Sequence, residues 1–156
     1  MLLVIDANVL IDMGYAGGIR VLPYLGKLVL LDVVLTECAG HQKQPTLEAD
    51  VLKAGIRQTP VLNGIRNEAR QYKRTSLSWA DTFVFCYALK HKGTVLTNEI
   101  SLRKTCEAFN VPFRGTIWIL EEAYKKSLVS SEEIRKWTEI LLELAQERRL
   151  PVQELR

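Results

Sequence analysis

Four carboxylates that follow predicted strands or begin predicted helices form the most informative pattern in the chain. Asp6 comes directly after the apolar run 2–5, which is typical of a buried strand. Glu37 follows the apolar segment "LVLLDVVL", Glu99 follows "TVLTN", and Asp81 lies in the first turn of a predicted helix. Because the carboxyl ends of parallel strands meet at one edge of a sheet, acids that are distant in the sequence can meet there.

Three of these acids also have a purely structural explanation. Asp6 can cap the short helix that follows it, since Asp is a favoured N-cap residue. Asp81 and Glu99 can complement the positive end of a helix dipole. Taken together, however, four carboxylates in one pocket repel one another and need cations or protons to coexist. Mg²⁺ and Mn²⁺ prefer oxygen ligands and are often held with substrate phosphates, so the set points to phosphoryl chemistry.

Strand and helix patterns alternate along the chain and can position these acids. The sequence predicts strands at 2–5, 28–35, 94–97 and 111–113, and a further strand piece is possible at 51–56. Such alternation is typical of βαβ units and a mainly parallel sheet in an α/β fold. Helices are predicted at 7–13, within 17–27, from 36 with Thr36 as N-cap, and at 63–75, 76–93, 98–110, 115–127 and 131–149.

Individual residues mark several helix ends. Ser76 or Ser78 is predicted to begin the helix within 76–93, and Gly93 is predicted to follow its last turn. A capping box from Ser130 to Glu133 predicts the start of the last helix. An apolar stripe on that helix predicts packing within the chain rather than a dimer seam. The stripe consists of Ile134, Trp137, Leu141, Leu144 and Ala145.

Composition indicates one globular domain. The chain has 156 residues, of which 47% are hydrophobic and 25% charged, and a net charge of +3 permits a polyanionic partner without requiring one. The three cysteines, Cys38, Cys86 and Cys106, predict buried reduced thiols, and two histidines without a CxxC pair argue against zinc. Without a basic leader or an apolar run of membrane-spanning length, we expect a cytoplasmic protein with no membrane contact.

The ordered motifs resemble those of the PIN domain family, and in particular its VapC-like toxin ribonucleases. The resemblance rests on "VIDANVLI", the acid in "LTECA", "LSWAD", the strand followed by Thr97-Asn98-acid and then Leu102-Arg103, and the "RGT" step before a helix. It covers residues 1–129 and implies a three-layer α/β/α, Rossmann-like fold with a central, mainly parallel sheet. Residues 130–156 are then expected to form a C-terminal helical extension packed on the same domain.

By position, the resemblance assigns the metal-binding acids to Asp6, Glu37, Asp81 and Glu99. Asn8 matches a small polar residue that orients the first aspartate or a metal-bound water, which completes the expected catalytic set. One departure stands out, because the family usually has aspartate where this chain has Glu99. An extra methylene matters where productive geometry must hold to roughly half an ångström. Two further acids, Asp12 and Asp32, fall outside the motifs and are interpreted as bystanders.

The function implied is that of an endoribonuclease dependent on Mg²⁺ or Mn²⁺, acting as the toxin of a toxin-antitoxin pair. The expected partners are RNA, a cognate antitoxin and a second copy of the chain. An alternative is a PIN-like RNA- or protein-binding module in which Glu99 has weakened catalysis. A phosphatase of the haloacid dehalogenase type is disfavoured, since it needs a second acid where this chain has Asn8.

Basic residues flank the acidic motifs and predict contacts to RNA phosphates, although a solvated helix face would show the same pattern. The candidates are Arg66, Arg70, Lys73, Arg74, Arg103 and Lys104. Most of the aromatic residues on the helix that carries Asp81 are interpreted as core residues rather than base-stacking platforms. These are Trp79, Phe83, Phe85 and Tyr87.

Overall fold

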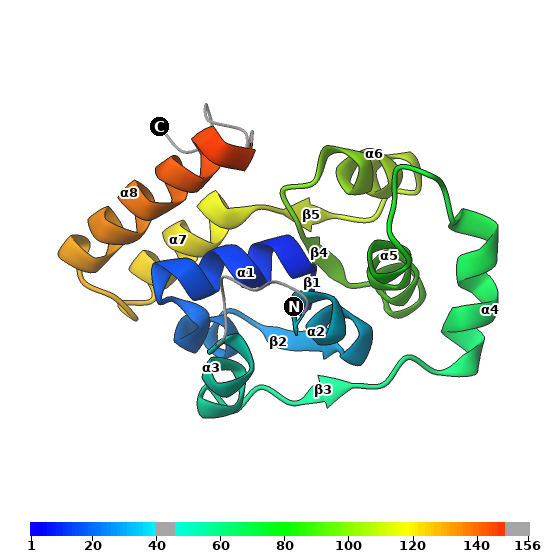
Figure 1. Ribbon diagram of the computed structural model, residues 1–156, viewed down its shortest axis with the longest axis horizontal. Coiled ribbons are helices and arrows are strands. Elements are labelled where there is room, and N and C mark those ends of the chain that lie inside the picture. Colours follow the sequence, from blue (N-terminus) through cyan, green and yellow to red (C-terminus); the bar gives the residue numbers. More distant parts are fainter. Residues whose placement is uncertain (40–45, 149–156) are drawn as a thin grey trace.

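A parallel sheet forms the centre of the protein. A computed structural model describes residues 1–39 and 46–148, and in this part of the chain five parallel strands lie in the order β3-β2-β1-β4-β5 (Figure 1). The strands are β1 (Leu2–Ile5), β2 (Lys27–Leu31), β3 (Gln58–Thr59), β4 (Thr94–Leu96) and β5 (Phe113–Arg114). The predicted α/β class with a parallel sheet is confirmed.

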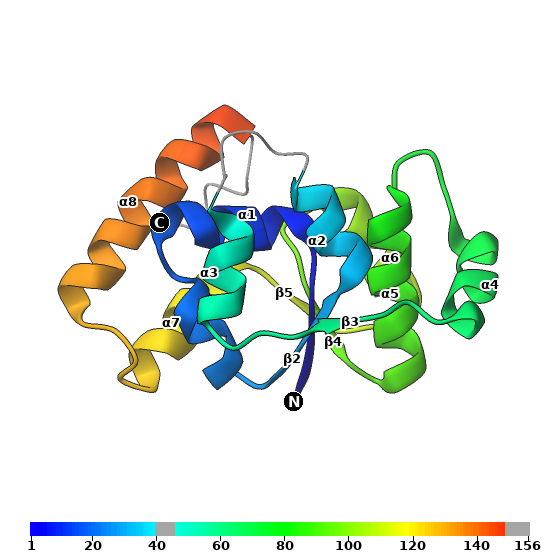
Figure 2. The same cartoon turned by 60° about the horizontal axis from the view of Figure 1, so that its bottom comes forward.

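Helices cover both faces of the sheet and complete a three-layer α/β/α arrangement (Figures 1 and 2). Helix α2 (Asp32–Ala39) contacts helices of both layers, α1 and α5. A short 3₁₀ helix, η1 (Ile19–Tyr24), precedes β2. One layer holds α1 (Ala7–Ala16), α3 (Leu47–Lys53), α7 (Thr116–Lys125) and α8 (Ser131–Arg148); the other holds α4 (Asn63–Tyr72), α5 (Trp79–His91) and α6 (Ile100–Ala108).

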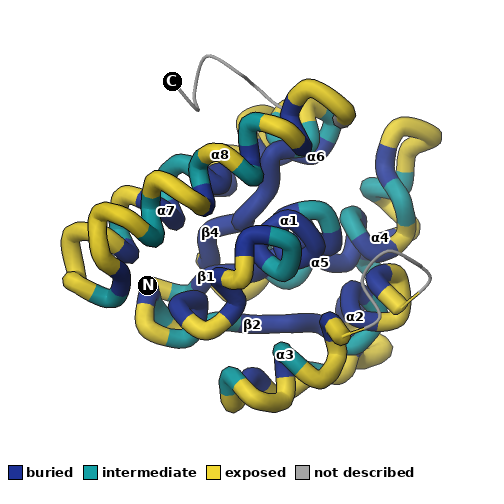
Figure 3. Tube along the Cα trace, turned by 60° about the vertical axis from the view of Figure 1, so that its left-hand side comes forward, coloured by how far each residue is buried: buried dark blue, intermediate teal, exposed yellow. Residues whose placement is uncertain are grey.

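The central strand β1 is buried on both faces, as Figure 3 shows along its trace. Val4 pairs in register with Val29 of β2 on one side and with Val95 of β4 on the other. Leu3, Val4 and Ile5 have no exposed surface. Strands buried in this way read as continuous apolar runs, and therefore the position of Asp6 at the strand end was visible in the sequence.

The second predicted strand is too long. Strand β2 ends at Leu31, and α2 begins at Asp32, whose Oδ1 accepts a hydrogen bond from the Val33 amide at 2.7 Å. Thr36 is therefore inside the helix and not its N-cap; its hydroxyl donates to the Asp32 carbonyl at 3.1 Å. Residues 40–44 of the predicted helix, including His41, lie outside the described residues.

Two further local predictions need correction. The possible strand at 51–56 is instead the end of helix α3 and the turn that follows it. Helix α5 begins at the predicted Ser78, whose Oγ accepts from the Asp81 amide at 3.0 Å. It ends one residue earlier than predicted, because Lys92 and not Gly93 takes the left-handed conformation, with φ of 55°.

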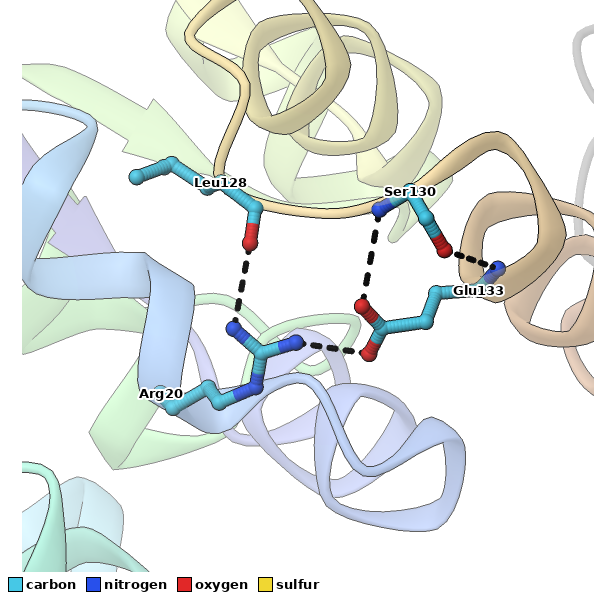
Figure 4. Close-up of polar contacts among 4 residues, drawn as sticks. All are labelled: Arg20, Leu128, Ser130 and Glu133. Atoms are coloured by element: carbon cyan, nitrogen blue, oxygen red, sulfur yellow. Dashed lines mark hydrogen bonds and ion pairs between the residues drawn. The ribbon is translucent and has the colours of Figure 1, made fainter.

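The last helix is attached to α1 and η1 by both apolar and polar contacts. Ser130 and Glu133 form the predicted capping box, with the Glu133 amide donating to Ser130 Oγ at 3.1 Å (Figure 4). Arg20 pairs with Glu133 at 2.7 Å and donates to the Leu128 carbonyl. Four residues of the predicted stripe are buried, namely Trp137, Leu141, Leu144 and Ala145, and α8 contacts α1.

Across the described residues, every helix is too short or too polar to cross a lipid bilayer.

Candidate functional site

Asp6 combines two roles at the junction of β1 and α1. Its backbone is extended, and its Oδ1 accepts a hydrogen bond from the Val9 amide at 2.8 Å, so it caps α1 as the sequence allows. The side chain has no exposed surface. Its second oxygen, Oδ2, has no hydrogen bond of acceptable geometry from any described residue. A buried carboxylate oxygen without a donor is costly unless a proton or cation satisfies it.

Burial raises the pKa of Asp6 from 3.8 to about 8. The nearby Thr97 hydroxyl and the Val9 amide favour the charged form, whereas the charges of Asp81 and Glu99 raise the pKa further. Desolvation dominates because the side chain is completely enclosed. Asp6 is therefore protonated at neutral pH unless a cation takes the place of the proton.

Asp81 and Glu37 face the same edge of the sheet from different helices. Asp81 lies in the first turn of α5, and its pKa is raised by burial and by the charge of Glu99. Glu37 lies in the second turn of α2, not directly after a strand as predicted, and it is more exposed. Burial and the charges of Asp81 and Glu99 still raise its pKa. The helical position thus keeps Glu37 within electrostatic reach of the other acids.

Glu99 is the N-cap residue of α6 and contacts α1 across the site. The Asn8 side-chain amide donates a hydrogen bond to Glu99 Oε1. Asn8 therefore holds Glu99, while the Val9 amide holds Asp6. The family resemblance assigned Asn8 to the first aspartate or to a water, and this contact with Glu99 was not visible in the motif.

Three residues that the motifs contain, but to which the sequence assigned no role, shape the segment before Glu99. The Thr97 hydroxyl accepts a hydrogen bond from the Glu99 amide at 2.9 Å. Asn98 Oδ1 accepts from the Thr116 amide at 3.2 Å, and Asn98 Nδ2 donates to the Thr116 hydroxyl. The polar residues of "TN" and "RGT" were the signal that could have pointed to this contact.

The predicted RNA-binding residues do not form one group. Arg66 and Arg70 are exposed on α4, which packs along α5, and the Arg66 guanidinium lies 5.3 Å from the ring centre of Phe83. Lys73 Nζ lies 5.5 Å from the ring centre of Trp79. Trp79 is two residues before Asp81 in the chain. Arg74 and Lys104 are exposed as well, whereas the Arg103 guanidinium is hydrogen-bonded to Thr97 and Asn98.

The interpretation of the α5 aromatics as core is correct for two of them. Phe83 and Phe85 are buried, and Tyr87 is partly buried. Trp79 differs, because 49% of its surface is exposed. An indole in this place has a surface on which a nucleotide base can stack.

The acidic residues suit a hard divalent cation in their chemistry. Their donors are carboxylate oxygens, the charges of Asp81 and Glu99 raise the pKa values of Asp6 and Glu37, and Asp6 Oδ2 accepts no hydrogen bond of good geometry from the described residues. Among residues 1–39 and 46–148, no three acidic, histidine or cysteine side chains already lie close enough to enclose an ion. The chemistry of these carboxylates fits a divalent cation. Binding such an ion would require their side chains to move closer together.

Covalent catalysis by a thiol does not fit this site. Cys38, Cys86 and Cys106 are buried and free, as predicted, and burial raises the pKa of each thiol to about 12. A thiol with so high a pKa is a poor nucleophile at neutral pH. The acidic residues are therefore the candidate chemical groups.

Comparison with known proteins gives the family. A family model described as the PIN domain matches residues 2–154, which is nearly the whole chain. No curated protein matches this chain. PIN domains are generally nucleases, which hydrolyse nucleic acid, and the parallel sheet between two helical layers agrees with their fold. The chain therefore belongs to the PIN domain family.

Proposed function

We propose that the protein is a metal-dependent endoribonuclease. The observation that carries the proposal is the buried Asp6 carboxyl, which has one oxygen without a hydrogen-bond partner among the described residues. Burial raises its pKa, and the charges of two further acids, Asp81 and Glu99, raise it further. Such a group can bind a cation where strands β1 and β4 end, and ligands bind at that edge in open α/β sheets.

Asp6, Asp81 and Glu99 would hold one Mg²⁺ or Mn²⁺, with Glu37 assisting through a second ion or a water. Such an ion lowers the pKa of a water molecule and neutralises charge on the phosphate. The Val9 amide holds Asp6 Oδ1, so the buried Oδ2 is the oxygen that would bind the ion. Asn8 fixes Glu99 in the same way, and therefore the chain positions two acids through hydrogen bonds.

The substrate would approach along α4 and the start of α5. Arg66 and Arg70 are four residues apart on α4 and exposed, so they can follow an RNA backbone. Trp79 offers an exposed ring near Asp81, and Lys73 adds a cation beside it. Arg74 and Lys104 complete the proposed phosphate contacts. Single-stranded RNA fits this combination of cations and an aromatic platform.

The decisive experiment is cleavage of a mixed single-stranded RNA pool with Mg²⁺ or Mn²⁺, with and without EDTA. We expect cutting by the wild type that EDTA abolishes and that Asp6→Asn lacks. Asp32→Asn is the matched control, because Asp32 directly follows the neighbouring strand β2 and begins α2. We expect Glu99→Asp to cut faster, since it restores the usual residue. Normal cutting by Asp6→Asn would overturn the proposal.

A second candidate function is a binding module with weakened catalysis. The observation that favours it is the contact between Asn8 and Glu99, which engages one of the four carboxylates within the protein itself. If every variant binds RNA and remains folded but none cuts, this second function replaces the first. Cutting that appears only in Glu99→Asp would show that Glu99 is responsible for the loss.

We further propose, on the resemblance to VapC-like proteins, a toxin role with a cognate antitoxin over the acidic edge and a homodimeric state. The apolar stripe of α8 is buried against the chain itself, so a dimer would have to use another surface. Light scattering, which gives the molecular mass in solution, tests whether the protein is a dimer. Protection of a growing culture by a co-expressed neighbouring gene tests the antitoxin.

A further inference from the structure

Arg103 of α6 is fastened to the segment that carries Glu99. Its Nε donates to the Thr97 carbonyl at 2.9 Å, and its Nη2 donates to Asn98 Oδ1 at 3.3 Å. The guanidinium also lies over Phe113 of β5, 5.2 Å from the ring centre. A planar guanidinium with two donors in a fixed geometry suits such a fastening role.

Asn98 extends this fastening to the first turn of α7. Its Oδ1 accepts from the Thr116 amide, and its Nδ2 donates to the Thr116 hydroxyl. Asn98 is 7% exposed and Thr116 is 1% exposed, so these bonds form away from water and define one arrangement. Four residues, Thr97, Asn98, Arg103 and Thr116, thus form a cluster that we name the Arg103 clamp.

The lack of a side chain at Gly115 leaves space for Arg103 and Asn98 of the Arg103 clamp. A Cβ at this position would overlap Arg103 Nη2 and would lie 2.5 Å from Asn98 Oδ1. Both atoms take part in the hydrogen bond between Arg103 and Asn98. A single methyl group at Gly115 would therefore displace the clamp without changing any charge.

The Arg103 clamp is hydrogen-bonded to Glu99, one of the acidic residues. The Thr97 hydroxyl accepts from the Glu99 amide at 2.9 Å, and Glu99 in turn accepts from Asn8. We propose that Arg103 is a positioning residue that, through Thr97 and Asn98, sets Glu99 against Asn8 and the other acids. The catalytic consequence rests on the proposed nuclease function; the positioning of Glu99 does not.

The competing role for Arg103 is the phosphate contact that the sequence suggested. Beside the clamp is a hollow of about 270 Å³, lined by Arg103, Arg114, Trp118 and Glu121 among others, which could admit an anion. A phosphate contact and a positioning role make different predictions. Loss of a phosphate contact weakens RNA binding and its salt dependence, whereas loss of positioning disturbs Glu99 and leaves RNA binding intact.

The test compares Arg103→Lys and Gly115→Ala with the controls Arg135→Lys and Gly64→Ala. Arg135 is exposed on α8, and a Cβ at Gly64 would meet only the mobile end of Lys90. Thermal unfolding first verifies that each variant is folded. NMR of the Asn8 side-chain amide then reports its contact with Glu99, with Glu99→Ala as the reference for the broken contact.

We expect both clamp variants, and neither control, to move the Asn8 amide signals toward those of Glu99→Ala. We also expect about 10- to 100-fold lower kcat and weaker Mn²⁺ binding measured without RNA, with KM and the salt slope of RNA binding unchanged. The inference would be overturned if the Asn8 signals did not move. It would also be overturned if a further variant, Arg103→Gln, lowered the salt slope of RNA binding but kept its kcat. If the signals move but the wild type does not cut RNA, the nuclease proposal fails and the positioning role stands.

Discussion

The Asn8 amide and the Glu99 carboxylate, 91 positions apart in the chain, are joined by a hydrogen bond across the acidic residues. Asn8 lies in the first turn of α1, and Glu99 occupies the N-cap position of α6 after the neighbouring strand β4. The longer side chain of glutamate provides the reach for this contact. The departure from the usual aspartate is thus accompanied by a specific partner within the chain.

The contact between Asn8 and Glu99 should be measurable as a coupling. We expect Asn8→Ala to destabilise the wild type by about 1 kcal/mol, because it leaves a carboxylate oxygen without its donor. In a Glu99→Asp background the shorter side chain no longer reaches Asn8, so the same substitution should cost almost nothing. Urea unfolding of the four proteins in EDTA completes the double-mutant cycle. Equal costs in both backgrounds would contradict the contact.

The stability of the protein in EDTA should fall as the pH rises from about 4 to about 8. Asp6 keeps its proton in the folded state up to a pKa of about 8, whereas the unfolded chain loses it near 3.8. Between these values the folded state holds the extra proton, so raising the pH favours unfolding. Asp81 and Glu37, whose pKa values are also raised, add to the same slope.

Asp6→Asn provides the control for this pH dependence. Asparagine keeps an acceptor for the Val9 amide and has no charge to bury. We expect it to stabilise the protein in EDTA at pH 8.5 by roughly 1–3 kcal/mol and to flatten the slope. Saturating Mg²⁺ should stabilise the wild type at high pH but leave Asp6→Asn unchanged. Unfolding midpoints in urea at several pH values would measure both effects, and a rising slope would refute them.

Neutralising Arg66 and Arg70 together should weaken RNA binding and its dependence on salt. If each contacts one phosphate of a single strand, the slope of log K against log salt falls by roughly 1.4 in magnitude. The measurement uses fluorescence anisotropy with labelled RNA in EDTA. Arg135→Gln with Lys136→Gln removes the same charge from α8 and should leave the slope unchanged. Identical slopes for the two double variants would place the substrate elsewhere.

Trp79→Ala should weaken the binding of single-stranded RNA without altering its salt slope. Stacking of one base on an aromatic side chain contributes about 1–3 kcal/mol. Tyr124→Ala is the matched control, because Tyr124 is 54% exposed on α7 and Trp79 is 49% exposed on α5. Quenching of tryptophan fluorescence by RNA, present in the wild type and reduced in Trp79→Ala, measures the contact directly.

Helix α8 should depend on its apolar contacts far more than on its ion pair. Trp137 is 5% exposed, and its truncation to alanine is expected to cost about 3–5 kcal/mol. The Arg20–Glu133 pair is half-exposed (Figure 4), so Arg20→Gln should cost at most about 1 kcal/mol. Urea unfolding compares the two variants. A larger loss in Arg20→Gln would show that the pair and not the indole fastens the helix.

The sequence revealed those parts of the site that depend on local patterns. Asp6 follows a strand whose residues are all apolar, and Ser78 precedes a helix with Asp81 in its first turn. Strand β1 and helix α5 could therefore be predicted together with the acids they carry. The family motifs then supplied Glu99 and Asn8 by position.

The end of β2 could not be predicted, because "VVL" after Asp32 is as apolar as a strand and short apolar runs do not distinguish strand from helix. In the structure β2 ends at Leu31 and α2 begins at Asp32. The contacts of Asn98 with Thr116 and of Asn8 with Glu99 join segments that are distant in the sequence. Their existence depends on how β4 and β5 lie beside β1, which no local pattern contains.

The pairing of β1 with β4 also determines when the acidic edge can exist during synthesis. Asp6 leaves the ribosome before its sheet partner β4, which begins at Thr94, and Glu99 follows β4. A nascent chain that stops before β4 has the first acid without the fourth, and its central strand is paired on one side only. A site that needs both Asp6 and Glu99 is thus complete only after β4 has been synthesised and has paired with β1.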